Sequence, residues 1–146
     1  MQVKDIIDIA PVSISTDAPI PHTARALRQH AIGLLPVCDC RGVLVGVLTA
    51  GDLVRRGMVL GPNVFDLTPE DLMTRHAIWC SPIEDIVDVA RLMQINNVRC
   101  LPVKDAEGKI AGVISLKDIV ALMPSLATID LVAPVPKDGN TPPYHP

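Results

Sequence analysis

The sequence predicts a mixed α/β (α+β) fold in which one β-α-β-β-α unit occurs twice, with the two copies packed about a pseudo-twofold axis. Three observations support this prediction: an internal repeat, short apolar strands beside helix stripes in each copy, and the composition of a globular protein. The chain has 146 residues, of which 49% are hydrophobic and 20% are charged. This length is enough for one ordinary domain or for two small units that share a core.

The internal repeat appears when the chain is shifted against itself by 66 positions, which aligns the two halves without a gap. The matched residues are those of turns, strand ends and helix starts, namely Leu35-Pro36-Val37 with Leu101-Pro102-Val103, Asp39 with Asp105, Gly42 with Gly108, Gly46 with Gly112, and Asp52 with Asp118. Because residues of such different structural roles match in a single register, the pattern indicates one supersecondary unit present twice.

Each copy is expected to begin with a helical turn and a brief strand, followed by an amphipathic helix. The turns are predicted around Lys4–Ile7 and Glu70–Met73, and the strands near Val12–Ile14 and Ile78–Cys80. The helices show the i, i+3, i+4, i+7 stripe of a buried face, with Ile20, Thr23, Ala24 and Leu27 in the first copy and Ile86, Val89, Ala90 and Met93 in the second. The second helix is expected to open at Ser81-Pro82-Ile83-Glu84, which has the form of a capping box.

A β-hairpin and a final helix complete each copy. The short apolar segments Leu34–Cys38 and Cys100–Lys104 are predicted as buried strands, and the returning strands are predicted at Val43–Leu48 and Lys109–Ile114. Between them, Asp-x-x-Gly sequences predict tight turns in which Gly supplies a positive φ. The final helices are expected to begin at Thr49 and Ser115.

These elements divide the chain into four parts. Residues 1–56 form the first repeat, residues 57–67 a linker that contains helix-stopping Gly, Pro and Asn, and residues 68–123 the second repeat. Residues 124–146 form a C-terminal extension that is Pro-rich and is expected to be disordered at its end.

Both copies share a longer motif, in which Leu-Pro-Val is followed by Asp-x-x-Gly and then by Gly, two hydrophobic residues and Thr/Ser-x-x-Asp. This pattern resembles a CBS domain, and two such domains in tandem resemble a Bateman module; the resemblance covers about residues 1–123. It implies a β-sheet sandwich flanked by helices, frequent disc-shaped homodimers, and clefts that in many relatives hold AMP, ADP, ATP or another adenosine derivative.

The Thr/Ser-x-x-Asp sequences are the sharpest candidates for ligand binding. Each lies where a strand becomes a helix, so backbone N–H groups and a hydroxyl are placed to meet a phosphate, and the Asp can accept two hydrogen bonds from a ribose diol. The resemblance assigns those two roles to Thr49 and Asp52 and to Ser115 and Asp118. The same sequence is also typical of a helix cap, which on residue chemistry alone is the more frequent use.

By the same resemblance, each cleft takes its Asp motif from one repeat and its purine-contacting walls from the other. The first cleft combines Thr49, Asp52, Trp79, Cys80, Val98, Arg99 and Cys100. The second cleft combines Ser115, Lys117, Asp118, Ser13, Ile14, Ile32, Gly33 and Leu34. Arg99 and Lys117 are candidate phosphate cations, with solvated surface charge as the alternative, and Trp79 has a core or interface role as its alternative. Since the two motifs differ before the Asp, the clefts are expected to differ in charge.

Charge and cysteine usage narrow the classes of function. The formal net charge of −3, without a basic stripe, argues against nucleic-acid binding. No apolar run approaches the roughly 18 residues of a membrane span, and residues 1–9 lack the apolar core of a signal peptide. A cytoplasmic protein with reduced cysteines is therefore expected. The Cys38-x-Cys40 spacing is short for a metal knuckle and no nucleophile stands beside a base, so neither a metal nor an enzymatic activity is expected.

The function that these features indicate is a regulatory or sensor module that binds an adenine nucleotide and signals to an unidentified effector protein, as a homodimer. S-adenosylmethionine and NAD are further candidate ligands. Two other interpretations stay open. One is a ligand-free dimerisation or interaction module whose Asp residues only cap helices, and the other is a thiol or metal sensor that uses the four cysteines.

Overall fold

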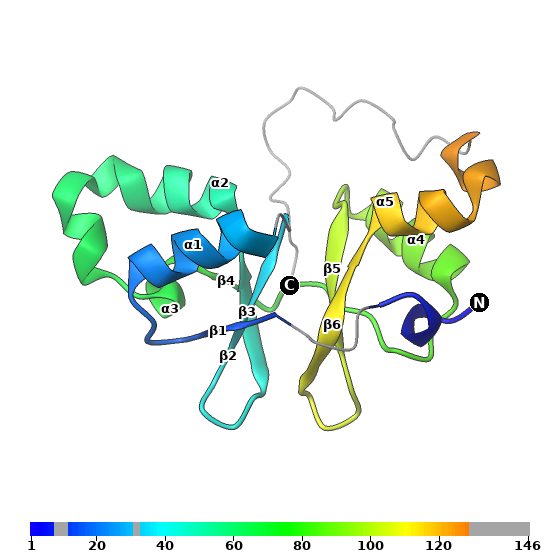
Figure 1. Cartoon of the computed structure of the whole chain (residues 1–146), viewed down its shortest axis with the longest axis horizontal. Coiled ribbons are helices and arrows are strands. Elements are labelled where there is room, and N and C mark those ends of the chain that lie inside the picture. The colour runs from blue at the N-terminus through cyan, green and yellow to red at the C-terminus, as the bar shows by residue number, and fades with distance from the viewer. Residues whose placement is uncertain (8–11, 31–32, 129–146) are drawn as a thin grey trace.

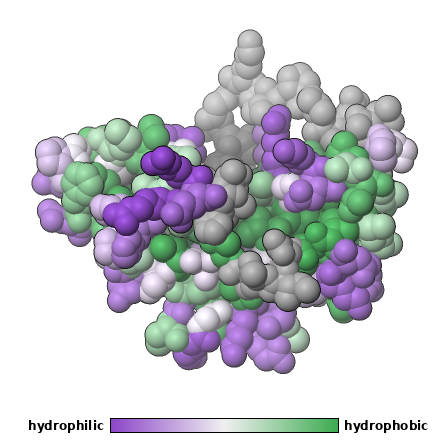
Figure 2. Space-filling model, in the orientation of Figure 1, coloured by the Kyte–Doolittle hydropathy of each residue, from purple (hydrophilic) through white to green (hydrophobic). Residues whose placement is uncertain are grey.

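Two β-hairpins stand side by side at the centre of the molecule, with helices on their outer sides (Figure 1). The structure is a computed structural model that describes residues 1–7, 12–30 and 33–128. Each hairpin belongs to one repeat, which confirms the predicted α+β architecture of two similar units. Hydrophilic residues cover the hairpin ends in the space-filling view (Figure 2). None of the described helices is long and apolar enough to cross a lipid bilayer.

The first half of the chain builds a four-stranded sheet with helices beside it. Its elements are η1 (Val3–Asp5), β1 (Ile14–Ser15), α1 (Ile20–His30), β2 (Leu35–Cys38), β3 (Leu44–Leu48), α2 (Ala50–Asp52), η2 (Leu53–Gly57) and η3 (Met58–Asp66). The strand order is β1-β2-β3-β4, where β4 (Thr74–Arg75) follows the linker. β1 is parallel to β2, whereas the β2–β3 and β3–β4 pairs are antiparallel.

The second half repeats this arrangement in α3 (Pro69–Leu72), α4 (Ile86–Ile95), β5 (Cys100–Lys104), β6 (Ile110–Ser115), α5 (Leu116–Leu122) and η4 (Pro124–Thr128). β5 and β6 are antiparallel, and Cys80 forms a parallel bridge to Val103 where the first half has β1. The two hairpins also meet directly, because the Leu44 N–H donates to the Gly108 carbonyl at 2.9 Å. This contact joins the two repeats near their turns.

The hairpin turns confirm the predicted use of Asp and Gly. Gly42 and Gly108 have φ values of 81° and 82°, a left-handed conformation that is accessible to glycine at little cost. The Asp39 carboxylate accepts hydrogen bonds from two backbone N–H groups of its turn, at 2.9 and 3.0 Å. Asp105 accepts the same pair of bonds in the second turn. Each Asp and Gly together therefore close one hairpin.

The segment that opens each half packs against the other half of the chain. Val3 is fully buried in the core of the second repeat, and its N–H donates to the Glu84 carbonyl at 3.0 Å. In the same way, the Glu70 N–H donates to the Thr16 carbonyl at 3.2 Å, and β4 extends the first sheet beside β3. The repeats therefore exchange their opening segments, and residues 76–79 cross from one sheet to the other.

The helix stripe is confirmed in the second copy and only partly in the first. All four predicted positions of α4 are buried, namely Ile86, Val89, Ala90 and Met93. Three predicted positions of α1 are buried, namely Ile20, Thr23 and Leu27. Ala24 is exposed, and α1 is the more polar of the two helices.

The structure differs from the prediction at the start of α4, in the linker, and near Ile78–Cys80, where only Cys80 forms an isolated bridge in place of a strand. α4 begins at Ile86 rather than at Ser81, because the Asp85 carboxylate accepts a hydrogen bond from the Val87 N–H at 2.9 Å and caps the helix there. The preceding residues 81–84 form a separate turn. The linker is helical as η3 for most of its length, and it is interrupted at Gly61, where φ is 63°. The Pro-rich end of the C-terminal extension lies outside the described residues.

Candidate functional site

Both Thr/Ser-x-x-Asp sequences form capping boxes at the start of their helices. The Thr49 N–H donates to the Asp52 carboxylate at 2.9 Å, and the Asp52 N–H donates to the Thr49 hydroxyl at 3.1 Å. Ser115 and Asp118 form the same two bonds at 3.2 and 3.1 Å. The capping alternative is therefore realised in this structure, and the N–H groups that form these bonds are not available to a phosphate.

The two Asp motifs differ in burial and in charge. The Asp52 side chain is 2% exposed and lies 3.8 Å from the Arg55 guanidinium, which folds back towards Gly51. Asp118 is exposed to solvent, and the residue equivalent to Arg55 in the second copy is Ala121. Since a carboxylate offers about four lone-pair positions, Asp118 can keep its cap and still accept hydrogen bonds from a ligand. Asp52 is covered and already paired with a cation.

The exposed Asp118 lies at a junction formed by residues of both repeats. Cys100, at the start of β5, is paired with Ser115 across the hairpin. Gly33 of the first repeat is so close that a Cβ added to it would lie 3.5 Å from the Cys100 sulfur. Burial raises the pKa of the Cys100 thiol, the Asp118 charge raises it further, and a backbone hydrogen bond from Gly33 opposes both effects. We call Gly33, Cys100, Ser115 and Asp118 the Asp118 junction; it unites Cys100 of the predicted first cleft with three residues of the second.

The remaining predicted wall residues are divided between the interior and the surface. The buried ones are Leu34, Cys80 and Val98, whose side chains take little part in any cleft surface in this structure. The exposed ones are Ser13, Trp79, Arg99 and Lys117, and Ile14 is half-buried in β1. Ile32 lies outside the described residues.

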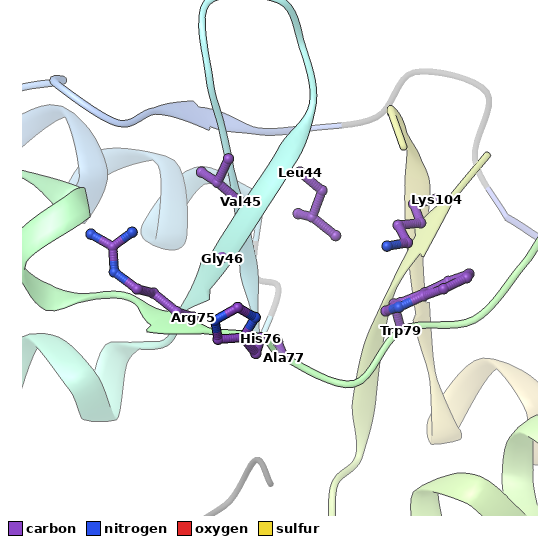
Figure 3. Close-up of a pocket in the computed structure, with 8 residues that line it drawn as sticks. All are labelled: Leu44, Val45, Gly46, Arg75, His76, Ala77, Trp79 and Lys104. Carbon is purple, nitrogen blue, oxygen red and sulfur yellow. The ribbon is translucent and has the colours of Figure 1, made fainter. Parts of the chain in front are cut away.

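A pocket of about 470 Å³ lies between β3 and β5, where residues 76–79 cross between the sheets. Its lining residues are Leu44, Val45, Gly46, Arg75, His76, Ala77, Trp79 and Lys104. Lys104 and Trp79 lie on one side and His76 on the other, while the Arg75 guanidinium points away from Lys104 and Trp79 (Figure 3). The Lys104 ammonium lies 3.9 Å from the centre of the Trp79 ring. Of the predicted site residues in the described part of the chain, Trp79 alone lines this pocket.

Three cationic or titratable residues of this pocket, Arg75, His76 and Lys104, were not among the predicted site residues. The internal repeat nevertheless contains a signal for them. The equivalent positions of the first copy are occupied by Ile9, Ala10 and Cys38. Cys38 is buried whereas Lys104 is partly exposed, so equivalent positions of the two copies differ in both polarity and burial.

The cysteines are all free thiols: Cys38 and Cys80 are buried, Cys100 is half-buried, and Cys40 is exposed in its turn. Burial raises the pKa of Cys80 to about 12 and also raises the pKa of Cys38, so both are held as unreactive thiols. Within residues 1–7, 12–30 and 33–128, no group of three or more His, Cys, Asp or Glu is placed to hold a metal ion.

Comparison with known proteins identifies both repeats with one family model. The model for the CBS domain matches residues 3–58 and 70–125. L-aspartate semialdehyde sulfurtransferase of Methanocaldococcus jannaschii is 32% identical over 120 residues, which cover 82% of this chain and 23% of that enzyme. An uncharacterized protein of Methanopyrus kandleri is 27% identical over 128 residues, which cover 87% of this chain and 63% of that protein. The chain thus spans less than two thirds of the length of these two relatives.

One solved structure with a similar fold is a complex with two small-molecule ligands. The CBS domain pair of protein MJ0100, in complex with 5′-methylthioadenosine and S-adenosyl-L-methionine, has a TM-score of 0.74 and 31% sequence identity. The match covers 86% of this chain and 98% of that chain. Both of those ligands contain an adenosine group.

Proposed function

Because the chain belongs to the CBS-domain family, we propose that it is a regulatory module that binds an adenosine derivative and signals to a partner protein. The observation that carries the proposal is the exposed Asp118 carboxylate beside Ser115, at a junction that Gly33 of the other repeat completes. A carboxylate in this position suits the two hydroxyls of a ribose. The adenosine-containing ligands of the MJ0100 domain pair support this ligand class.

The two Asp motifs are proposed to differ in affinity, with the Asp118 side as the stronger site. Asp52 must leave Arg55 and become exposed before a ribose can reach it. Lys117 is exposed one residue before Asp118, where its ammonium adds a cation for a phosphate or carboxylate of the ligand. A ligand that binds one conformation better than another shifts the population towards the conformation that it prefers. An effector protein that contacts the module would respond to this change of conformation.

A thermal-shift series with AMP, ADP, ATP, S-adenosylmethionine, 5′-methylthioadenosine, NAD and GTP tests this proposal. A ligand at about a hundredfold over its Kd adds roughly 2.7 kcal/mol to the folded state and raises the Tm by several degrees. Asp118→Asn is expected to lose most of this shift, because it removes the charge that the ribose hydroxyls meet. Asp52→Asn is expected to keep it, since Asp52 is covered in this structure.

Each variant is compared with its own Tm without ligand, because both substitutions weaken a capping box. Cys100 provides a second measurement, since a ligand in the Asp118 junction should slow the alkylation of this half-buried thiol. If no adenosine compound shifts the Tm of protein purified without bound ligand, the interaction-module function is favoured, with both Asp residues acting as caps. Loss of the shift in Asp52→Asn alone would place the site in the other cleft.

We also propose that the module forms a homodimer through apolar side chains of η2 and η3. The exposed apolar residues of this surface are Val54, Met58, Val59, Leu60 and Phe65. A group of exposed apolar side chains on neighbouring helical turns is typical of a protein interface. A second copy of the chain is the proposed partner, in keeping with the paired modules that are frequent in the family.

Val59→Asp is expected to convert the dimer into a monomer, because a carboxylate without a partner would be buried at the contact. Light scattering coupled to size-exclusion chromatography measures the mass. Ile83→Asp is the matched control, since Ile83 is 67% exposed before α4 and Val59 is 73% exposed in η3. A wild-type monomer, or an unchanged dimer in Val59→Asp, would contradict this interface.

A further inference from the structure

The pocket between β3 and β5 has a chemical character of its own, and the adenosine site proposed above does not use it. We propose that this pocket binds the phosphate group of a phosphorylated small molecule, as a second site separate from the Asp118 junction. No residue of the junction is among the lining residues. A volume of about 470 Å³ is within the range of roughly 300–1,000 Å³ that small-molecule sites occupy.

Cations and an aromatic ring line the pocket, whereas none of its 8 lining residues is acidic. Lys and Arg groups bind phosphate through charge-assisted hydrogen bonds, and Arg can do so with two parallel bonds. Arg75 does pair with Glu70 at 3.2 Å, but both side chains are more than half exposed. Because an exposed ion pair contributes little, Arg75 can turn from Glu70 to an anion in the pocket.

Lys104 is the group that a phosphate would attract first. In the described part of the chain its ammonium has no acidic partner, and it lies over the Trp79 ring. A cation–π contact on a ring that is 42% exposed is weak, so the ammonium can leave the ring for an anion. The uncovered face of Trp79 then becomes available to the remainder of the ligand.

The cationic residues that line the pocket occur in only one of the two copies of the repeat. Arg75 and Lys104 correspond to Ile9 and Cys38 in the first copy, and Trp79 corresponds to Ser13. The hairpins form without these groups in the first copy, so folding does not require them in the second. His76, beside Arg75, has a φ of 53°, which is uncommon for a residue other than glycine.

The fluorescence of Trp79 tests the proposal, because Trp79 is the only tryptophan of the chain. Titration with pyrophosphate at constant ionic strength is expected to change its emission in a saturable way as Lys104 leaves the ring. Lys104→Met and Arg75→Met each keep an unbranched side chain and remove the positive charge. Each is expected to raise the apparent Kd for pyrophosphate by roughly tenfold or more. In Lys104→Met the Trp79 ring no longer has a cation over it, so titration calorimetry replaces fluorescence as the measurement of Kd.

Two variants outside the pocket serve as controls. Lys117→Met removes an exposed cation of the other site, and Asp118→Asn removes the proposed ribose ligand; both are expected to retain the pyrophosphate titration. No saturable change in the wild type, or equal weakening in Lys117→Met, would overturn the second site. Loss of the titration in Asp118→Asn would show that the pocket is not separate. Because Asp118→Asn is expected to reduce the adenosine-dependent Tm shift but not the pyrophosphate titration, failure of either proposal can be recognised independently of the other.

Discussion

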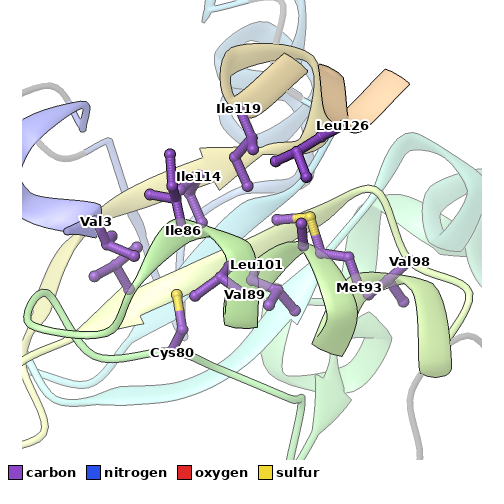
Figure 4. Close-up of a cluster of buried hydrophobic side chains, with 12 residues drawn as sticks. Val3, Cys80, Ile86, Val89, Met93, Val98, Leu101, Ile114, Ile119 and Leu126 are labelled. Atoms are coloured by element: carbon purple, nitrogen blue, oxygen red, sulfur yellow. The ribbon is translucent and has the colours of Figure 1, made fainter. Parts of the chain in front are cut away.

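Replacing Leu101 by alanine is expected to lower the free energy of unfolding by about 2–5 kcal/mol. Leu101 lies on β5 and is fully buried. Its neighbours in the second core come from α4, β6, α5 and the N-terminal segment (Figure 4). Truncation removes apolar surface from this cluster and leaves a cavity, which a packed interior refills only in part.

Urea unfolding followed by circular dichroism measures this loss. Ile95→Ala is the matched control, because Ile95 lies at the end of α4 with its side chain 80% exposed. The control is expected to change the free energy of unfolding by less than about 0.5 kcal/mol. An effect of similar size in both variants would show that Leu101 does not carry the packing that the structure assigns to it.

Gly46→Ala is expected to cost about 1–3 kcal/mol, the range found for overpacking a close contact. A Cβ at Gly46 would lie 2.6 Å from the Met73 sulfur and 2.8 Å from the Thr74 carbonyl oxygen. Gly46 is paired with Arg75 at this point, so β3 and β4 must move apart to admit a methyl group. The substitution should therefore weaken the attachment of the exchanged segment to the first sheet.

Gly51→Ala is the control for the close contact of Gly46 with Met73 and Thr74. Chemical denaturation measures the free energy of unfolding of both variants. A Cβ at Gly51 would meet the Arg55 guanidinium at 2.9 Å, but that side chain is 65% exposed and can swing away. Alanine is also favoured over glycine in a helix. Gly51→Ala is therefore expected to leave stability nearly unchanged or to raise it slightly. A loss as large as that of Gly46→Ala would argue against the contact between β3 and β4 as the cause.

The turns and caps could be predicted from sequence because their hydrogen bonds join near neighbours. Asp39 closes its turn with bonds that reach at most four residues along the chain, and in the capping box of α2 the Asp52 carboxylate accepts a bond from the Thr49 N–H, three residues earlier. Such contacts are contained in a short stretch of sequence. The start of α4 was predicted wrongly because Ser81 and Asp85 are both local capping residues: Ser81 and Glu84 form bonds within a separate turn, and Asp85 caps the helix.

The burial of the wall residues is harder to predict, because it depends on which segments cover them. Cys80 and Val98 were assigned to a cleft wall, but both belong to the second core, which the exchanged residue Val3 completes. Nothing in the sequence near Cys80 shows that a segment more than seventy positions earlier will pack beside it. This is the general limit of a pattern that describes one element at a time.

The sequence by itself determined the repeated unit, its hairpins and its two Asp motifs, because the turns and caps that mark them are stabilised by contacts within a few residues. Only the tertiary structure decided that Asp118 is exposed while Asp52 is covered beside Arg55, a residue whose counterpart in the second copy is Ala121. It also decided the pocket between β3 and β5, since residues 76–79 cross between the sheets and Arg75 and Lys104 both belong to its lining. The burial of Cys80 and Val98 and the lining of this pocket depend on segments that are distant in sequence, because Val3 completes the second core and residues 76–79 join the two sheets.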